Sequence, residues 1–230
     1  MHMLEHYLNT LKLPTFLKNY TEIAEQCKAQ GSDYSEFLLR LSEMEVLSKH
    51  SRMVQQRIKQ ANFPVMKTLD SFDFKVVPSL EQRKVVELTT CEYVNNKSNV
   101  IALGNSGTGK THISIALGMA ACQKGITTLF VSAATLVNEL LEAREERHLL
   151  RLQNRLNKYQ LLIIDELGFV PFSKAGAELL FEVFSNRYEQ GSIIVTSNLP
   201  FQDWTQVFGC QRLTGALLDR LTHHVHILEQ

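Results

Sequence analysis

The sequence has no apolar run long enough to cross a bilayer. Its first residues also lack the charged segment and following apolar segment that mark a secretory signal. The four cysteines, Cys27, Cys91, Cys122 and Cys210, are widely scattered and form no Cys-x-x-Cys pair. This spacing predicts free thiols in a reducing compartment, and together these absences predict a cytoplasmic protein.

The chain has no net charge, because 24 Lys and Arg residues balance 24 Asp and Glu residues. The protein as a whole therefore gives no long-range attraction to nucleic acid, and any such contact must come from a local basic patch. There is also no internal repeat or low-complexity tract. At 230 residues, the chain can hold one sizeable domain and a small appendage.

Two parts of the chain differ in the spacing of their apolar residues. Residues 1–70 have helical spacing and no convincing strand, which predicts a small all-helical N-terminal domain for assembly or for DNA or partner contacts. Pro64 and Pro78 interrupt the pattern and indicate a linker. Residues 71–230 alternate helical segments with five short apolar runs, at 99–104, 127–133, 161–165, 192–198 and 224–229. This alternation predicts an α/β domain with a parallel five-stranded sheet between helices.

Residues 104–111 read GNSGTGKT, which matches the phosphate-loop pattern G-x-x-x-x-G-K-[ST] between a strand and a helix. The glycines let backbone N–H groups turn toward phosphate oxygens, and the following helix adds its positive end. Lys110 is expected to reach the β- and γ-phosphates, and Thr111 to bind Mg²⁺. The predicted nucleotide contacts are Gly104, Asn105, Ser106, Gly107, Thr108, Gly109, Lys110, Thr111 and His112.

The stretch LLIIDELG places Asp165 and Glu166 at the end of a buried strand. In a P-loop NTPase such an Asp holds Mg²⁺, and the neighbouring Glu can direct a water at the γ-phosphate. ATP is favoured over GTP because the string NKSN at 96–99 fails the guanine-binding pattern Asn-Lys-x-Asp. A water-directing Glu favours ATP hydrolysis over the alternative of a metabolite kinase.

Two later polar residues are further candidates. Asn198 ends the fourth apolar run, where it either orients the attacking water or forms a polar turn before Pro200. Arg220 lies on an otherwise apolar short helix. It is either a surface ion-pair partner or an arginine finger that acts on the nucleotide of a neighbouring subunit.

Two basic stripes are candidate tracks for DNA phosphates, or else solvated helix faces with ion pairs. They share helical spacing, and neither includes the aromatic series that stacks single-stranded bases, which favours duplex DNA. The first stripe is Arg144, Arg147, Arg151, Arg155 and Lys158 on one long helix, and the second is Lys49, Arg52, Arg57 and Lys59.

A histidine cluster near the end of the sequence gives no sign of a metal site. His223, His224 and His226 have no Cys or carboxylate at ligand spacing, so no metal site is predicted there.

The stretches GNSGTGKTHISIALGMAACQKG, LLIIDELGFVPF and ALLDRLTHHVHILE resemble the IstB-type ATP-binding proteins of insertion sequences. These are AAA+ P-loop NTPases, close to the DnaC-type helicase loaders. The resemblance implies ATP-dependent assembly on duplex DNA in support of a partner transposase, as a homo-oligomer with ATP sites between subunits. A rival hypothesis is a loader that docks on a replicative helicase.

The resemblance also implies roles for individual residues. Gly104 to Thr111 match Walker A, and Asp165 with Glu166 matches Walker B. Asn198 matches sensor 1, and Arg220 is the expected arginine finger with Arg212 as the alternative. Family members usually continue into a short tail with a possible second sensor, whereas this sequence ends at HILEQ. A truncated C-terminus would explain the difference and would remove any nucleotide-sensing residue there.

Overall fold

The structure is a computed structural model that describes residues 2–230. It divides into two compact units, Met1–Gln56 and Arg57–Gln230. The sequence places the boundary near residue 70 instead. The difference arises because the segment with prolines is not a free linker: its aromatic and aliphatic side chains pack against the core of the second unit. These side chains are Phe63, Leu69, Phe72 and Phe74.

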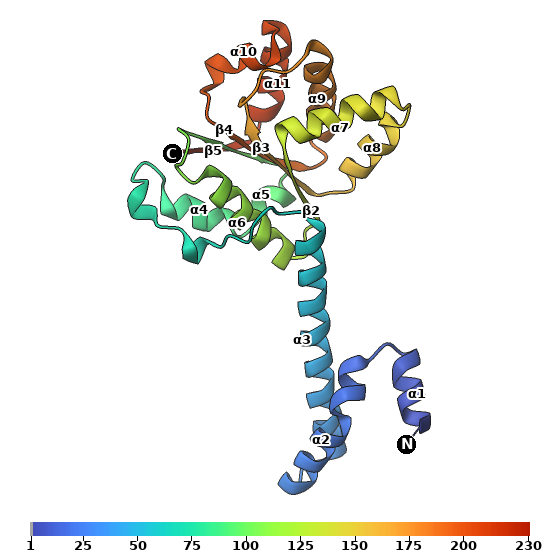
Figure 1. The fold of residues 1–230 in the computed structure, drawn as a ribbon. Helices are drawn as coiled ribbons and strands as arrows, with labels where there is room; N and C mark the ends of the chain where they lie inside the picture. Colours follow the sequence, from blue (N-terminus) through green and yellow to red (C-terminus); the bar gives the residue numbers. More distant parts are fainter. Residues whose placement is uncertain (1) are drawn as a thin grey trace. The chain divides into compact units, whose positions relative to one another are not determined.

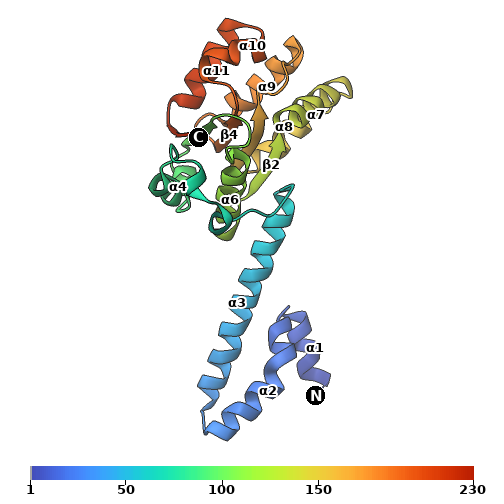
Figure 2. The ribbon, with the colours of Figure 1, turned by 60° about the vertical axis from the view of Figure 1, so that its left-hand side comes forward.

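The first unit contains α1 (His2–Thr10), α2 (Pro14–Gln30) and the larger part of α3 (Tyr34–Gln60). Helix α2 ends at Gly31, whose φ of 67° is left-handed, and α3 begins where Asp33 Oδ1 accepts a hydrogen bond from the Glu36 N–H at 2.8 Å. Helix α2 runs beside α3 (Figure 2). Ile23, Cys27 and Leu41 form the buried core between them.

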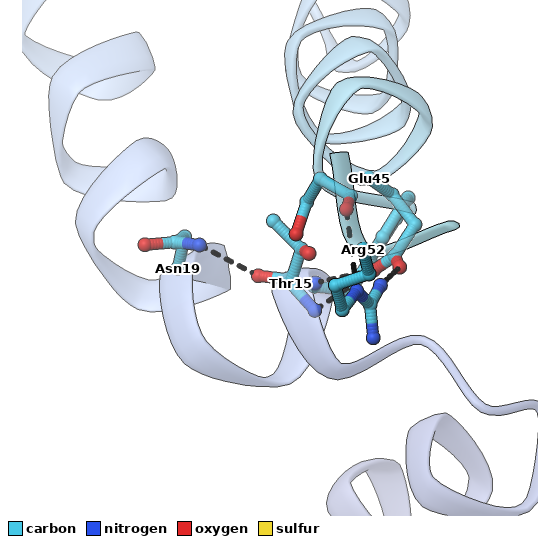
Figure 3. A network of polar contacts seen from close by, with 6 residues as sticks. Thr15, Asn19, Glu45 and Arg52 are labelled. Atoms are coloured by element: carbon cyan, nitrogen blue, oxygen red, sulfur yellow. Dashed lines mark hydrogen bonds and ion pairs between the residues drawn. The ribbon is translucent and has the colours of Figure 1, made fainter. Parts of the chain in front are cut away.

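The beginning of α2 is capped by a residue from α3 (Figure 3). Leu13 precedes the helix and has a side chain that cannot accept a hydrogen bond. Glu45 Oε2 accepts hydrogen bonds from the Thr15 and Phe16 N–H groups at 2.8 and 3.3 Å, and Arg52 donates to Glu45 Oε1 at 2.9 Å. Burial raises the pKa of Glu45, but these hydrogen bonds outweigh it and lower the pKa overall. The carboxylate therefore joins the two helices.

Replacing Glu45 by glutamine is expected to weaken the first turn of α2 by roughly 1–2 kcal/mol, as for loss of a charged cap. Because the folded pKa is lowered, the stabilisation is present above the unfolded pKa of about 4.3 and is lost as the pH falls through the folded pKa. Hydrogen exchange at the Thr15 and Phe16 amides measures both effects. Exposed Glu25 provides the control, Glu25→Gln. Equal exchange in the two variants would contradict the capping role.

The second unit is built on a five-stranded sheet in the order β2-β3-β4-β1-β5, in which all neighbouring strands are parallel. This confirms the predicted parallel five-stranded sheet. Consecutive residues of β1, β3 and β4 are buried, as expected for strands covered on both faces of a parallel sheet. The strands are β1 (Asn99–Leu103), β2 (Thr128–Ser132), β3 (Leu161–Leu167), β4 (Ser192–Ser197) and β5 (Val225–Glu229).

Helices cover both faces of this sheet (Figure 1). Helices α4, α5 and α6 pack on one face, and α7, α9, α10 and α11 pack on the other. No described helix has the length and apolar character of a membrane span. The bounds are α4 (Gln82–Leu88), α5 (Glu92–Asn95), α6 (Lys110–Gln123), α7 (Ala133–Glu145), α8 (Leu149–Asn157), α9 (Lys174–Arg187), α10 (Trp204–Phe208) and α11 (Gln211–Thr222). Three short 3₁₀ turns are Leu69–Ser71, Phe74–Val76 and Phe201–Asp203.

The predicted single long helix after β2 is wrong, because the chain breaks it into α7 and α8. Arg147 adopts a left-handed φ of 61°. The His148 N–H then donates to the Ala143 carbonyl at 2.8 Å, and the Arg147 N–H donates to the Arg144 carbonyl at 3.2 Å. This pair of bonds ends a helix, usually with glycine at the left-handed position. The first basic stripe therefore lies on two helices and the turn between them.

Candidate nucleotide site

The phosphate loop connects the end of β1 at Leu103 to the start of α6 at Lys110. Gly107 and Gly109 have φ angles of 83° and 95°, a left-handed range that side chains rarely adopt. Gly109 also has no space for one, because a Cβ there would lie 2.5 Å from Phe72 Cε2. The loop conformation thus depends on glycine at this position for two independent reasons.

Lys110 holds the loop closed through its ammonium group. Its Nζ donates to the Gly104 carbonyl at 2.8 Å and to the Asn105 carbonyl at 2.6 Å. Burial lowers the pKa of Lys110, and the nearby carboxylates of Asp165 and Glu166 oppose that shift. The ammonium therefore lies at the loop within the electrostatic influence of both acids.

Asp165 is only 5% exposed and receives two hydroxyl hydrogen bonds. Thr111 Oγ1 donates to its carboxylate at 3.0 Å, and Thr196 Oγ1 donates to Oδ1 at 2.6 Å. Burial raises the pKa of Asp165, although the hydrogen bonds from Thr196 and Thr111 and the charge of Lys110 act against it. A buried carboxylate beside a hydroxyl group is a fitting pair of oxygen ligands for Mg²⁺. The structure thus brings Thr111 of the predicted Walker A motif into contact with Asp165 of the predicted Walker B motif.

Glu166 lies at a β-bulge. The β3–β4 register passes from Ile164↔Val195 to Leu167↔Ser197, so β3 has one more residue than β4 in this interval. Glu166 itself has a left-handed φ of 59° and is exposed. In a regular strand, neighbouring side chains point to opposite faces. The bulge interrupts this alternation at Asp165 and Glu166.

Residues of β4 hold this bulge in place. The Glu166 N–H donates to Thr196 Oγ1 at 2.9 Å, and the same hydroxyl donates to Asp165. Ser197 Oγ donates to the Leu167 carbonyl at 2.6 Å. Thr196 therefore links the backbone of one acid to the carboxylate of the other. Neither Thr196 nor Ser197 was among the site residues predicted from the sequence.

A cavity of about 300 Å³ collects most of the predicted groups. Walker A and Walker B side chains and Asn198 reach it from three different elements, and Asp165 contacts two of its lining residues. The Phe169 ring, absent from the predicted site, is also part of the wall. The lining residues are Ser106, Gly107, Gly109, Lys110, Thr111, Glu166, Phe169, Thr196 and Asn198.

Other predicted nucleotide contacts lie beside this cavity rather than on its wall. Thr108 Oγ1 donates to the Asn105 carbonyl at 3.0 Å and so braces the loop internally. His112 Nε2 lies 2.8 Å from the Thr68 carbonyl, and its ring contacts that of Phe72 with centroids 5.2 Å apart. The segment around Thr68 and Phe72 therefore covers the start of α6. Sequence reasoning missed this contact by treating the segment as a linker.

Arg220 and Arg212 both line a separate groove of about 680 Å³, formed by α9, α10, α11 and the loop before α9. The Arg220 guanidinium carbon lies 4.9 Å from the ring centroid of Phe181, and Nη1 donates to the Ala216 carbonyl at 3.0 Å. The structure thus does not bring either arginine into the P-loop cavity of its own chain.

The basic residues predicted to bind DNA have different surroundings. Arg147, Arg151, Arg155 and Lys158 line a hollow of about 960 Å³ with acidic neighbours, while Arg144 is on the last turn of α7. Arg155 forms a 2.9 Å ion pair with Glu139. In the second stripe, Lys49 is exposed and Arg52 is bonded to Glu45, whereas Arg57 and Lys59 belong to the second unit.

Comparison with known proteins identifies close relatives along almost the whole chain. An ATP-binding protein of insertion sequence IS5376 from Geobacillus stearothermophilus is 39% identical over 221 residues, which are 96% of this chain and 88% of the relative. An ATP-binding protein of insertion sequence IS21 from Pseudomonas aeruginosa is also 39% identical, over 224 residues, which are 97% of this chain and 84% of the relative.

The fold has solved counterparts. The DnaC helicase loader matches with a TM-score of 0.55 and 20% identity, covering 70% of this chain and 95% of that one. At this identity the likeness concerns the fold alone, and it confirms the predicted AAA+ P-loop architecture. The family described as "IstB-like ATP binding protein" matches residues 6–230. The chain therefore belongs to the IstB-like ATP-binding protein family.

Proposed function

We propose that this protein is a Mg²⁺-dependent ATPase that assembles on duplex DNA and assists the transposase of an insertion sequence. The observation that carries the proposal is the 3.0 Å hydrogen bond between Thr111 Oγ1 and Asp165. It joins the phosphate loop to a buried acid behind the wall of a cavity that an exposed second acid, Glu166, also lines. The relatives that match almost the whole chain come from insertion sequences, which supports transposition as the setting.

The residues in and around the cavity have different roles in ATP hydrolysis. Lys110 binds the β- and γ-phosphates after exchanging its loop carbonyls for phosphate oxygens. Thr111 and Asp165 would hold Mg²⁺, which neutralises charge on the phosphates. Glu166 accepts a proton from the attacking water and aligns it with the γ-phosphorus, while Asn198 donates a hydrogen bond to that phosphate or to the water.

DNA contacts are proposed for the basic residues around the hollow between α7 and α8. Arg147, Arg151 and Lys158 can reach phosphates, whereas Arg155 is already paired with Glu139. Each phosphate contact releases counterions, so affinity must fall as salt rises. The second stripe, Lys49, Arg52, Arg57 and Lys59, is the alternative track.

The proposal predicts that ATP and a DNA duplex together raise the mass of the protein in light scattering and increase its rate of ATP hydrolysis. Lys110→Ala should remove both responses, because the phosphates lose their main cation. A wild-type protein that keeps its mass, or a Lys110→Ala protein that still assembles with ATP, would contradict the proposal. A rate of ATP hydrolysis that is the same with and without DNA would instead favour a metabolite kinase.

Two further measurements sharpen this experiment. Arg151→Ala should reduce the salt dependence of duplex binding by about one counterion. Arg155→Ala is the matched control and should leave the salt dependence unchanged, because Arg155 already pairs with Glu139. Capture with the transposase, rather than with a replicative helicase, separates the proposed role from that of a helicase loader. Binding to the helicase alone would favour the role of a helicase loader with the same ATPase chemistry.

A further inference from the structure

The hydroxyl group of Thr196 contacts both acids of the candidate nucleotide site. It donates a hydrogen bond to Asp165 Oδ1 at 2.6 Å and accepts one from the Glu166 N–H at 2.9 Å. A hydroxyl group has a single proton, so that proton lies toward the carboxylate and a lone pair lies toward the N–H. Thr196 is only 1% exposed, and bulk water therefore does not compete for either bond.

The first of these bonds distinguishes the two carboxylate oxygens of Asp165. Oδ1 accepts the proton of Thr196, while Thr111 Oγ1 lies 3.1 Å from Oδ1 and 3.0 Å from Oδ2. Carboxylates that bind a metal ion are commonly held in orientation by hydrogen bonds of this kind. The bond from β4 therefore fixes the carboxylate at Oδ1 and leaves the lone pairs of Oδ2 for a cation beside Thr111.

The second bond holds an unfavourable backbone conformation at Glu166. Its φ of 59° is left-handed, and residues with a side chain keep such a conformation only where surrounding contacts fix it. The Glu166 N–H has Thr196 Oγ1 as its acceptor at the bulge, where β3 departs from regular pairing with β4. Loss of the hydroxyl group would remove this acceptor. The backbone position from which the Glu166 side chain extends therefore depends on Thr196.

We propose that Thr196 is a positioning residue for ATP hydrolysis, whose hydroxyl group orients Asp165 for Mg²⁺ and fixes the backbone from which Glu166 directs the attacking water. This inference rests on the proposed function, because it uses the roles given there to the two acids. Thr196 acts through both acids at once. Its loss should therefore impair both Mg²⁺ binding and hydrolysis, whereas substitution of Glu166 should affect mainly hydrolysis.

Thr196→Val tests this role, because it removes the hydroxyl group and keeps a branched side chain of similar shape. The variant should need about 10-fold more Mg²⁺ for half-maximal binding of a fluorescent ATP analogue, since Asp165 loses a hydrogen bond to its charged group. Single-turnover hydrolysis should be about 10- to 100-fold slower, because the water-directing group is less well placed. Thr196→Ser, which keeps the hydroxyl group, should restore both properties. An unchanged Mg²⁺ requirement in Thr196→Val, or no recovery in Thr196→Ser, would overturn the proposal.

Hydrogen exchange at the Glu166 amide tests the second bond without any hydrolysis. In the wild-type protein this N–H is bonded to a buried hydroxyl group and should exchange slowly. In Thr196→Val it loses its acceptor and should exchange about 10-fold faster or more, whereas Thr196→Ser should keep the protection. Equal exchange of this amide in the wild-type and Thr196→Val proteins would overturn the proposal.

A double variant separates positioning of Glu166 from a general loss of structure. If Thr196 acts on hydrolysis through Glu166, Thr196→Val should cause little further loss in a Glu166→Gln protein, whose water-directing group is already absent. Two effects that instead multiply fully in the double variant would show that Thr196 does not act through Glu166, and would overturn the positioning role.

Thr128→Val is the matched control for loss of a buried hydroxyl group from the sheet. Thr128 lies on β2, is 1% exposed, and donates to the Ile126 carbonyl at 3.4 Å. This variant should keep the wild-type Mg²⁺ requirement and hydrolysis, and equal losses in Thr128→Val and Thr196→Val would overturn the proposal. A wild-type protein that binds ATP without hydrolysing it would contradict the proposed function instead, because the Mg²⁺ requirement and the Glu166 amide would still report on Thr196.

Discussion

Replacing Glu166 by glutamine is expected to lower the rate of ATP hydrolysis by about 10²–10⁴-fold, the range found for loss of a general base. The amide keeps the size of the side chain but cannot accept a proton from water. ATP binding and ATP-dependent assembly on DNA should persist, because the phosphate loop and Asp165 are unchanged. Single-turnover hydrolysis and fluorescent ATP binding measure the two properties separately.

Asp165→Asn is the matched comparison. Asp165 is buried and accepts hydrogen bonds from Thr111 and Thr196, whereas Glu166 is exposed. The first substitution should therefore weaken Mg²⁺-ATP binding, and the second should act on hydrolysis after binding. Retained hydrolysis in Glu166→Gln would exclude its role in directing water. Equal loss of binding in both variants would show that the two acids do not divide these roles.

The sequence predicts different roles for these two acids, but it could not predict the β-bulge at which Glu166 lies. A continuous apolar run followed by two carboxylates predicts a buried parallel strand with acids at its end. It also predicts that adjacent side chains point apart. The left-handed φ of Glu166 and its bond to Thr196 resolve this conflict. Thr196 is 30 residues away, so no local pattern could have predicted the bulge.

The break between α7 and α8 was missed for a related reason. Helix ends are predicted from Gly, Asn or Pro, as Gly31 at the end of α2 illustrates. At the later break the left-handed position is occupied by Arg147, and its helical neighbours continue the same periodicity. Packing of Leu152 and Leu156 into the sheet core fixes the direction of α8 after the turn. That tertiary contact overrides the local propensity.

Two interactions across the chain also lay beyond sequence reasoning. Phe72 covers Gly109 of the phosphate loop, although its segment had the prolines and polar residues of a linker. Glu45 caps a helix that begins 31 residues earlier. In both cases the sequence identifies a local departure from regular structure but contains no signal for its partner. Only the fold brings the two together.

Replacing Arg220 by alanine is expected to reduce ATP hydrolysis by about 10³–10⁵-fold while ATP binding is retained, as for loss of an arginine finger. The side chain lies over Phe181 in a groove that excludes the P-loop residues of its own chain. It could therefore act only on the nucleotide of another subunit. Arg212→Ala tests the alternative finger, because Arg212 lines the same groove.

A mixture of two inactive variants can show whether Arg220 acts between subunits. Glu166→Gln subunits retain Arg220, and Arg220→Ala subunits retain Glu166. When they assemble together, some ATP sites combine Glu166 from one subunit with Arg220 from its neighbour, so hydrolysis should recover in the mixture. Action within one chain would leave every site defective and the mixture inactive. Recovery would thus make contact between subunits a condition for hydrolysis, which links the chemistry of the acid pair to assembly on DNA.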